Sequence, residues 1–431
     1  MSDFDLLVRS AQDIGISEGK IIALGKSLSG SAKSEIDAHG LATFPGVIDA
    51  HVHFNQPGRT EWEGFDSGSR AAAAGGTTTV FEMPLNAQPP TIDGWSFDLK
   101  RASAETDSFV DFALWGGLVP GNIDQLETLR DRGVIGLKAF MCDSGMDDFP
   151  AVDEQELRAG MQRAAELGLI VAVHAESQEI TQQLTQDRIA AGKTSVRDYL
   201  ESRPVRAELE AIHQALDLAG ETGCRLHIVH VSCGRGVEII ARSRARGVDV
   251  TCETCPHYLF LTEEDMKRLG AVAKCAPPLR APDEQKDLLS HLHDVATIGS
   301  DHSPSPWSMK ERTSFFEVWG GISSCQHLLS LLLDASISPT EIERLTSKTV
   351  AERFGLAQKG AIEIGKDADF TLVDLNDEDT VTTENLHYRH RHTPYLGRKL
   401  RGRVVRTVLR GQTIFHNGKI TARSMGKFIR P

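Results

Sequence analysis

The sequence predicts an α/β protein: a (β/α)8 barrel, or TIM barrel, with a small β-sandwich domain built from both chain termini. Over residues 46–356, short apolar runs alternate with amphipathic stretches of helical period, which is typical of parallel strands joined by helices. This span of roughly 310 residues can hold eight such units with insertions. Residues 1–45 and 357–431 contain strand-like runs instead, so we expect them to form the two parts of the small domain.

Each predicted element rests on a local pattern. Near the N-terminus the strands are expected at 5–8 and 20–24, and no long helical period interrupts them. Within the barrel, the predicted strands are 78–81, 134–137, 169–173, 226–229, 248–251 and 295–299, and the clearest helices are 154–167, 207–218 and 236–246. Towards the C-terminus, strands are expected at 367–373 and 404–409, with turns at 411 and 417–418. A doubly wound sheet is the alternative, but no Gly-rich phosphate loop opens the first helix.

Composition narrows the class of protein. Of 431 residues, 40% are hydrophobic and 25% charged, and the formal net charge is −13. This charge argues against nucleic-acid and anionic-membrane partners. The sequence has no apolar run of about 20 residues and no signal-peptide pattern at its start. Seven scattered cysteines, an odd number, fit reduced thiols, so a cytoplasmic protein is expected.

The most informative motif is His51-Val52-His53 at the end of an apolar run. Residues i and i+2 of a strand point to the same side, so the two imidazoles can share one metal ion. Two ligands do not complete a site. Barrel enzymes carry their chemistry at the carboxyl ends of the strands, so the remaining ligands are expected after the other apolar runs.

Those runs are followed by Lys138, His174, His230 and Asp301. Taken singly, a histidine at a strand end is more often a structural hydrogen-bonding group, and Asp301 could cap a helix. Because ligand types recur on strand after strand, the sequence predicts a site for two divalent metal ions.

Lys138 is the unusual member of this set. A buried ammonium is costly, and burial lowers the pKa of a lysine towards the neutral amine. A neutral amine can add CO2 to give an anionic carbamate, whose two oxygens could bridge two metals. The alternative, a side chain that reaches solvent, remains open from the residues alone.

These motifs resemble those of the cyclic amidohydrolases, the family of allantoinases, hydantoinases and dihydroorotases. The resemblance covers essentially the whole chain through PGVIDAHVH (45–53), GGTTTV (75–80), GLKAFM (136–141), HAES (174–177), HIVHVS (227–232), ETCPHYL (253–259), PPLR (277–280), SDHSP (300–304) and GKDADF (365–370).

The resemblance implies that His51, His53 and Asp301 hold one metal and that His174 and His230 hold the other. It also implies that Lys138 is N6-carboxylated and bridges them together with a hydroxide, and that Asp301 is the general base. Zinc is expected first, while Mn²⁺, Co²⁺ and Fe²⁺ suit the same ligands. The family further implies a homotetramer.

Three positions separate the substrates of the family. Dihydroorotases have an Arg where this chain has Asn55 and a His where it has Ser305, and both grip a carboxylate. Hydantoinases have a Tyr where this chain has Asp143. The segments 55–64 and 82–86 are similar to allantoinases, so hydrolysis of the ring amide of allantoin to allantoate is expected.

Four residues are expected to contact this substrate: Asn55, Asn86, Cys275 and Gly320. Turn formation is the alternative for Asn86 and Gly320. His257 is a candidate contact or a structural group, and Cys252-x-x-Cys255 lacks the second pair that a structural zinc site needs. The alternative functions are a hydantoinase or dihydropyrimidinase and, more remotely, a non-catalytic scaffold, which a metal analysis would distinguish.

Overall fold

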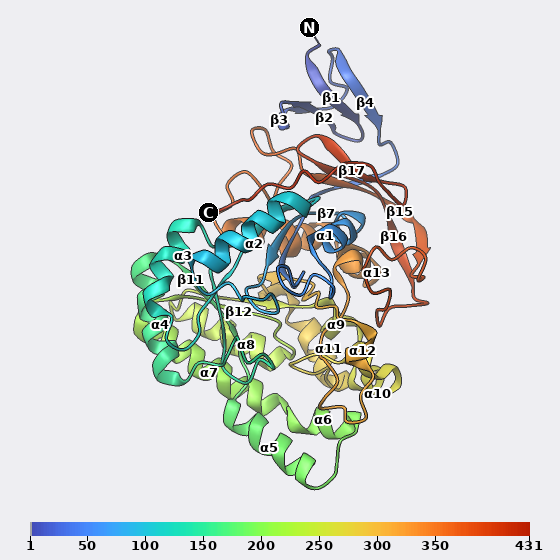
Figure 1. Cartoon of the computed structure of the whole chain (residues 1–431). Coiled ribbons are helices and arrows are strands. Elements are labelled where there is room, and N and C mark those ends of the chain that lie inside the picture. Colours follow the sequence, from blue (N-terminus) through green and yellow to red (C-terminus); the bar gives the residue numbers. More distant parts are fainter. Residues whose placement is uncertain (1) are drawn as a thin grey trace.

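The computed structural model describes residues 2–431. A barrel of parallel strands is ringed by helices, and two further sheets form a β domain at one end of the molecule (Figure 1). The predicted fold class is therefore confirmed.

The β domain contains strands from both ends of the chain. Its outer sheet has the order β3-β2-β1-β4, with β1 (Phe4–Arg9), β2 (Asp13–Ser17), β3 (Lys20–Gly25) and β4 (Ala32–Asp37). The second sheet has the order β18-β17-β16-β15-β5, with β5 (Ala42–Pro45), β15 (Phe370–Thr380), β16 (Lys399–Leu409), β17 (Gln412–His416) and β18 (Lys419–Ile420). Because β5 pairs with β15, N-terminal and C-terminal segments share one sheet.

The barrel contains parallel strands that follow one another in chain order. They are β6 (Val47–Val52), β7 (Thr77–Glu82), β8 (Asp111–Leu114) with its continuation β9 (Gly116–Gly117), β10 (Leu137–Phe140), β11 (Ile170–His174), β12 (Arg225–Ile228), β13 (Val250–Thr254) and β14 (Thr297–Ile298). A parallel bridge between Val52 and His302 closes the ring. The carboxyl ends of all these strands therefore meet at one mouth.

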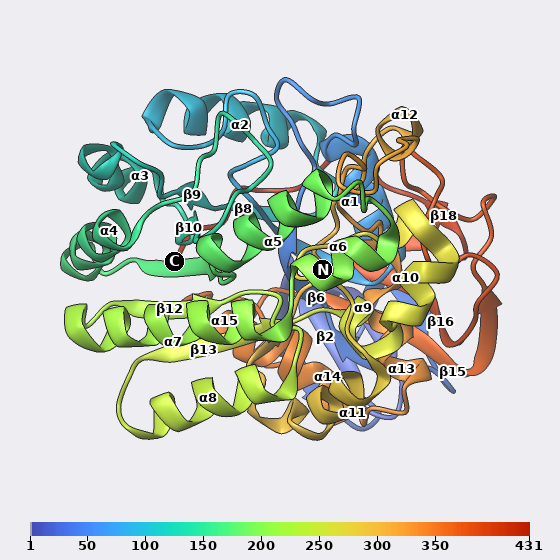
Figure 2. The same ribbon diagram turned by 90° about the horizontal axis from the view of Figure 1, so that it is seen from below.

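Helices surround this ring of strands, as Figure 2 shows from below. They are α1 (Phe65–Ala74), α2 (Gly94–Asp107), α3 (Leu126–Arg132), α4 (Glu154–Leu167), α5 (Gln178–Ala190), α6 (Val196–Ser202), α7 (Val205–Thr222), α8 (Gly234–Ala245), α9 (Pro256–Phe260), α10 (Glu263–Leu269), α11 (Pro282–Ser290), α12 (Trp307–Lys310), α13 (Leu328–Asp334), α14 (Pro339–Glu343) and α15 (Thr349–Arg353). Short 3-10 turns occupy Ile123–Gln125, Gly270–Ala273, Leu292–Asp294 and Cys325–His327, and a π-helical turn spans Arg344–Lys348.

Some strands begin later than the apolar runs predict. The run 134–137 starts three residues before β10 and overlaps it only at Leu137, so Lys138 lies inside the strand rather than after it. The run 248–251 likewise starts two residues before β13. At the C-terminus, 367–369 precede β15 because Asp367 and Asp369 turn towards Lys359. The proposed division at 1–45, 46–356 and 357–431 stays a prediction.

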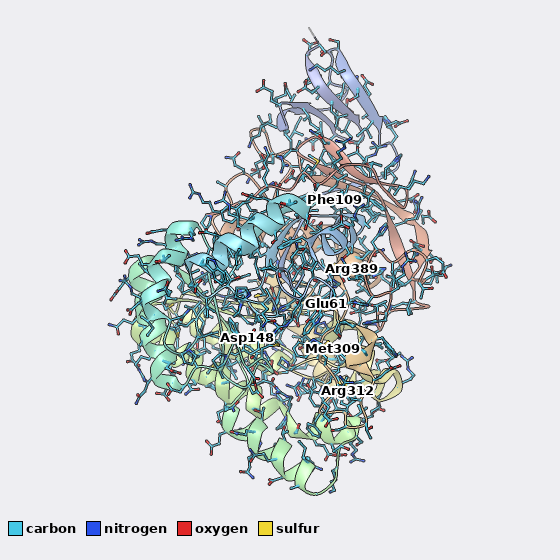
Figure 3. The ribbon with its side chains drawn as sticks, viewed as in Figure 1. Glu61, Phe109, Asp148, Met309, Arg312 and Arg389 are labelled. Atoms are coloured by element: carbon cyan, nitrogen blue, oxygen red, sulfur yellow. The ribbon has the colours of Figure 1, made fainter. Side chains whose placement is uncertain are left out.

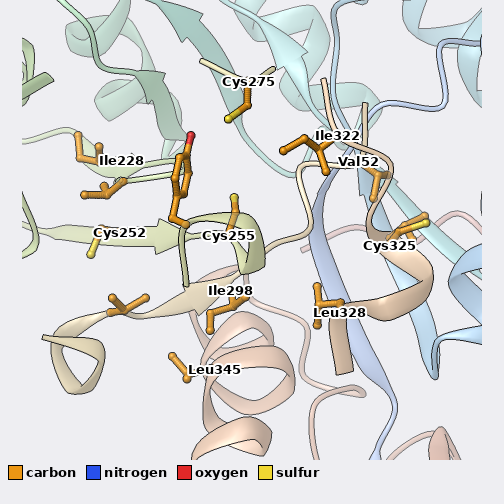
Figure 4. Packing of buried hydrophobic residues seen from close by; sticks show 14 of the residues in the cluster. Val52, Ile228, Cys252, Cys255, Cys275, Ile298, Ile322, Cys325, Leu328 and Leu345 are labelled. Atoms are coloured by element: carbon orange, nitrogen blue, oxygen red, sulfur yellow. The ribbon is translucent and has the colours of Figure 1, made fainter. Parts of the chain in front are cut away.

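Apolar side chains fill the space between the strand ends and the helices (Figure 4). Cys252, Cys255 and Cys275 belong to this packing, and all seven cysteines of the chain are buried and form no disulfide. Among the residues described, no helix combines the length and the apolar character that a membrane span needs.

Candidate metal centre

Three of the predicted ligands meet at the mouth of the barrel. His51 and His53 extend from the end of β6, and Asp301 follows β14. The Asp301 Oδ1 atom lies 3.2 Å from His51 Nε2 and 3.4 Å from His53 Nε2. Two ligand atoms on one tetrahedral zinc ion, with bonds of about 2.0–2.1 Å, are separated by about 3.4 Å. The three atoms therefore suit one cation.

A second pair of predicted ligands lies beside the first group. His174 ends β11 and His230 follows β12, and His174 Nδ1 is 3.1 Å from His230 Nε2. The His230 ring lies 5.5 Å from the His51 ring, measured between centroids. The two groups are therefore adjacent, as a binuclear centre requires.

Lys138 reaches this centre from β10. Its side chain is 1% exposed, and its Nζ atom has no hydrogen-bond partner among the described residues. Burial lowers its pKa to about 8, although the nearby Asp301 and Glu253 carboxylates oppose this effect. An amine in this state is available for carbamate formation near neutral pH.

The four imidazoles are neutral, which is the form that binds metals. Burial lowers the pKa of His51 to about 4, and it also lowers the pKa of His53, His174 and His230. For Asp301, burial acts to raise the pKa, but the surrounding imidazoles outweigh it and hold that pKa well below its usual range. The Asp301 carboxylate is therefore ionised, as a metal ligand or a proton acceptor at this position would need to be.

Two buried carboxylates orient these histidines, and sequence reasoning assigned them no role. Glu253 Oε1 lies 2.7 Å from His51 Nδ1, and Glu176 Oε2 lies 2.8 Å from His174 Nε2. Burial would raise the pKa of Glu176, yet Arg203 and His174 hold it at about 2. The His174 Nε2–H therefore donates to an anion, which leaves Nδ1 free for a metal.

A signal for both carboxylates was present in the sequence. Glu253 lies near the carboxyl end of β13, and Glu176 follows the ligand His174 by two residues. The strand-end rule that selected the ligands applies to them equally, with the difference that they bind the ligands rather than the metal.

Of the predicted substrate contacts, Asn86 lies beside one of the predicted ligands. Its Nδ2 atom is 3.4 Å from His53 Nδ1, and the residue is 5% exposed. Asn55 is fully buried, and its Nδ2 donates to the Pro304 carbonyl at 3.4 Å. Both have positive φ angles, 64° for Asn55 and 66° for Asn86, which asparagine tolerates better than most residues.

The other two predicted contacts lie on neighbouring loops. The Cys275 carbonyl accepts a 2.8 Å hydrogen bond from the Tyr199 hydroxyl. Gly320 is half-buried, and the next amide, Gly321 N–H, donates to the Lys274 carbonyl at 2.7 Å, which joins the two loops.

The other positions singled out in the sequence, His257, Ser305 and Asp143, differ in how deeply they are buried. His257 is fully buried, and one of its ring nitrogens lies within 4.8 Å of both Asp301 and Cys255. Ser305 is also fully buried, whereas Asp143 is exposed on the loop after β10. No arginine or histidine stands at positions 55 and 305 to hold a substrate carboxylate.

Comparisons with known proteins agree with this geometry. The model of the amidohydrolase family matches residues 42–414. The allantoinase of Rubrobacter xylanophilus is 55% identical over 447 residues, which cover 100% of this chain and 98% of that protein. The allantoinase of Deinococcus radiodurans is 48% identical, with 99% of each chain covered.

Solved structures give the same result for the fold. The L-hydantoinase (dihydropyrimidinase) from Arthrobacter aurescens superposes with a TM-score of 0.96 at 34% identity, covering 99% of this chain and 100% of that one. The dihydropyrimidinase from Brevibacillus agri gives a TM-score of 0.91 at 29% identity, covering 100% and 98%. The resemblance inferred from the motifs is confirmed.

Proposed function

From the premise that this chain belongs to the amidohydrolase family, we propose that its barrel mouth hydrolyses the ring amide of allantoin to give allantoate. The chain is a hydrolase of cyclic amides, and relatives named allantoinase match its whole length. The observation that carries the proposal is the convergence of His51, His53, Asp301, His174 and His230 around the buried amine of Lys138.

These residues would hold two divalent cations, with zinc as our first choice and Mn²⁺, Co²⁺ or Fe²⁺ as alternatives. When bound, the cations supply Lewis-acid polarisation of a carbonyl and a nucleophile from water at neutral pH. We assign His51, His53 and Asp301 to one cation and His174 and His230 to the other. Lys138 would supply a further ligand to this site as its N6-carboxylate, formed with CO2.

Asp301 performs the proton transfers in this proposal. Its low pKa keeps it ionised, so it can accept the proton of the attacking water. The same carboxyl then returns the proton to the ring nitrogen as the C–N bond breaks. The imidazoles of His51 and His53 keep one of its oxygens directed into the centre.

Neutral polar groups recognise the substrate. Asn86, beside His53, and the Gly320 peptide can pair with ureide donors and acceptors, while the Cys275 segment forms the adjoining wall. Asn55 Nδ2 donates to the Pro304 carbonyl, but its buried Oδ1 has no hydrogen-bond partner among the described residues, so we keep Asn55 as a proposed substrate contact. The absence of a cation at positions 55 and 305 disfavours dihydroorotate.

The test is a comparison of kcat/KM for allantoin, hydantoin and dihydroorotate, with the metal-loaded protein and added bicarbonate. We expect allantoin to be preferred, with allantoate as the product. Preferred cleavage of hydantoin would retain the chemistry but favour a hydantoinase, the second candidate, which the structural neighbours named hydantoinase support. We further propose that the protein is a cytoplasmic homotetramer. Light scattering of the purified protein tests the number of chains in the assembly.

A further inference from the structure

Two buried lysines without a carboxylate partner lie beside the barrel mouth. Lys274 is 5% exposed and Lys310 is 3% exposed. Within residues 2–431, neither forms an ion pair with a carboxylate, and the acceptors of both are backbone carbonyls. Burying an ammonium is costly unless strong acceptors surround it, so this arrangement needs a reason.

Both ammonium groups bind the backbone of one irregular segment, residues 315–321. Lys274 Nζ donates to the carbonyls of Phe315 at 2.7 Å, Phe316 at 3.2 Å and Val318 at 2.6 Å. Lys310 Nζ donates to the carbonyls of Trp319 at 2.9 Å and Gly321 at 2.8 Å. Figure 3 marks this region by Met309, the residue before Lys310.

This segment connects the loops that follow several barrel strands. The Trp319 ring packs edge-on against Trp62, with 4.9 Å between centroids, and Trp62 lies in the loop after β6. A Cβ at Gly145, in the loop after β10, would lie 4.0 Å from Trp319. Just after this segment, Ile322 pairs with His302, the residue that follows Asp301, and the Ile322 carbonyl accepts a 3.0 Å hydrogen bond from Ser303 N–H.

Between the backbone groups that the two lysines hold, one of the described residues keeps an unpaired N–H and an unpaired C=O. The carbonyls on either side of Gly320 are both held by Lys310, and Trp319 N–H and Gly321 N–H donate to Met309 and Lys274. In the described chain, no hydrogen bond involves the Gly320 N–H or C=O. Gly320 therefore presents one donor and one acceptor, which is the complement of an amide or ureide.

We propose that Lys274 and Lys310 are positioning residues for substrate recognition: they clamp residues 315–321 so that the Gly320 peptide meets the amide of the cyclic substrate. This inference rests on the proposed function. Their ammonium groups orient the segment from both sides without touching the substrate themselves.

The experiment uses the holoenzyme with Lys274→Met and Lys310→Met, and Lys366→Met as the matched control. Lys366 also donates to backbone carbonyls, those of Ala357 and Lys359, but away from the barrel mouth. We expect the first two variants to keep their metal content and to raise the KM for allantoin at least about tenfold, the effect of one misplaced hydrogen bond. Their kcat should stay within about threefold, and the control should behave as wild type.

Amide hydrogen exchange of residues 315–321 supplies a readout that does not depend on substrate. Faster exchange in this segment alone is expected for both Met variants, and unchanged exchange together with unchanged KM would overturn the clamp. If a Met variant does not fold, the Lys→Arg variant keeps the buried cation but changes its donor geometry, and it should show the same KM increase. The wild-type protein, measured in parallel, distinguishes the proposed function from the clamp. If the wild-type protein does not hydrolyse allantoin, the proposed substrate is refuted. If the variants have the same KM and the same hydrogen exchange as the wild type, the clamp is refuted.

Discussion

At the scale of single residues, the chemistry of the mouth depends on which side chains are buried together. Asp301 is held between two imidazoles, and Lys138 has an unpaired amine at the same centre. Burial favours the neutral form of each of these groups and lowers the pKa of His51 and Lys138, whereas the imidazoles around Asp301 outweigh burial and keep that carboxylate charged. Both states suit metal binding.

Replacing Asp301 tests its role in proton transfer. For Asp301→Ala we expect kcat for allantoin to fall by about 10³-fold or more, because a general base and a metal ligand are lost together. Steady-state kinetics checks this, with Asp131→Ala as a control that changes only an exposed ion pair with Arg130. A rate near wild type for Asp301→Ala would remove Asp301 from the mechanism.

The lowered pKa of Lys138 predicts how carboxylation depends on pH. Because that pKa is about 8, the neutral amine predominates above pH 8 and is lost as the pH falls below it. An ordinary lysine, with a pKa of about 10.4, would become neutral only near pH 10. At a fixed concentration of dissolved CO2, reactivation of metal-stripped protein should rise from pH 7 to 9 and then level off. A rate that still increases tenfold between pH 9 and 10 would contradict this.

At the scale of elements, the sequence predicts correctly whether a barrel segment is a strand or a helix, but it predicts less well the residue at which the segment begins. Three glycines with positive φ, Gly133, Gly168 and Gly247, end helices, and the apolar residue after each donates back to the helix: Val134 to Leu129, Leu169 to Ala164 and Val248 to Ser243. This is the Schellman pattern, in which an apolar residue seals the helix end. An apolar run cannot reveal that its first residue seals the end of the preceding helix instead of starting the strand, so the strands predicted at 134–137 and 248–251 begin too early.

The helix 154–167 was predicted to the residue because its start and its end both carry clear signals. Asp153 accepts from Glu156 N–H at 2.8 Å, Glu156 accepts from Asp153 N–H at 2.9 Å, and Gly168 follows in the left-handed conformation. The six predicted ligands likewise follow from strand ends, and the same rule points to Glu176 and Glu253. The contacts of Lys274 and Lys310 do not follow from the sequence, because they join segments about 10 to 45 residues apart in irregular loops.

Removing the N-cap of α4 tests how much the capping box contributes to the stability of the protein. Asp153→Ala should lower the free energy of unfolding by about 1 kcal/mol, since the Glu156 N–H at the helix start loses its side-chain acceptor. Urea denaturation measures this change. The control is Asp217→Ala at an exposed position inside α7, which is expected to leave the free energy of unfolding unchanged or to raise it slightly. Equal stability of the two variants would mean that the capping box contributes nothing.

At the scale of the whole molecule, a buried charge cluster joins the β domain to the barrel. Lys359 Nζ lies 2.6 Å from Asp111, 2.6 Å from Asp369 and 3.0 Å from Asp367. Asp111 begins β8 of the barrel, whereas Asp369 immediately precedes β15. Burial would lower the pKa of Lys359, but the three carboxylates raise it, so the ammonium is retained.

Lys359→Met should therefore destabilise the protein by about 3–5 kcal/mol, because carboxylates remain buried without their cation. Chemical denaturation checks this, and Lys399→Met, which removes an exposed pair with Glu378, should cost less than about 1 kcal/mol. A Lys359→Met protein as stable as wild type would show that the cluster does not hold the two parts together.

The central claim, that one mouth holds a two-metal hydrolytic centre, is tested most directly by titrating metal-free protein with zinc in bicarbonate while following allantoin hydrolysis. We predict that activity rises until two equivalents per chain are bound and then remains constant. Full activity without metal, or a plateau at one equivalent, would contradict the assignment of His51, His53 and Asp301 to one cation and His174 and His230 to another.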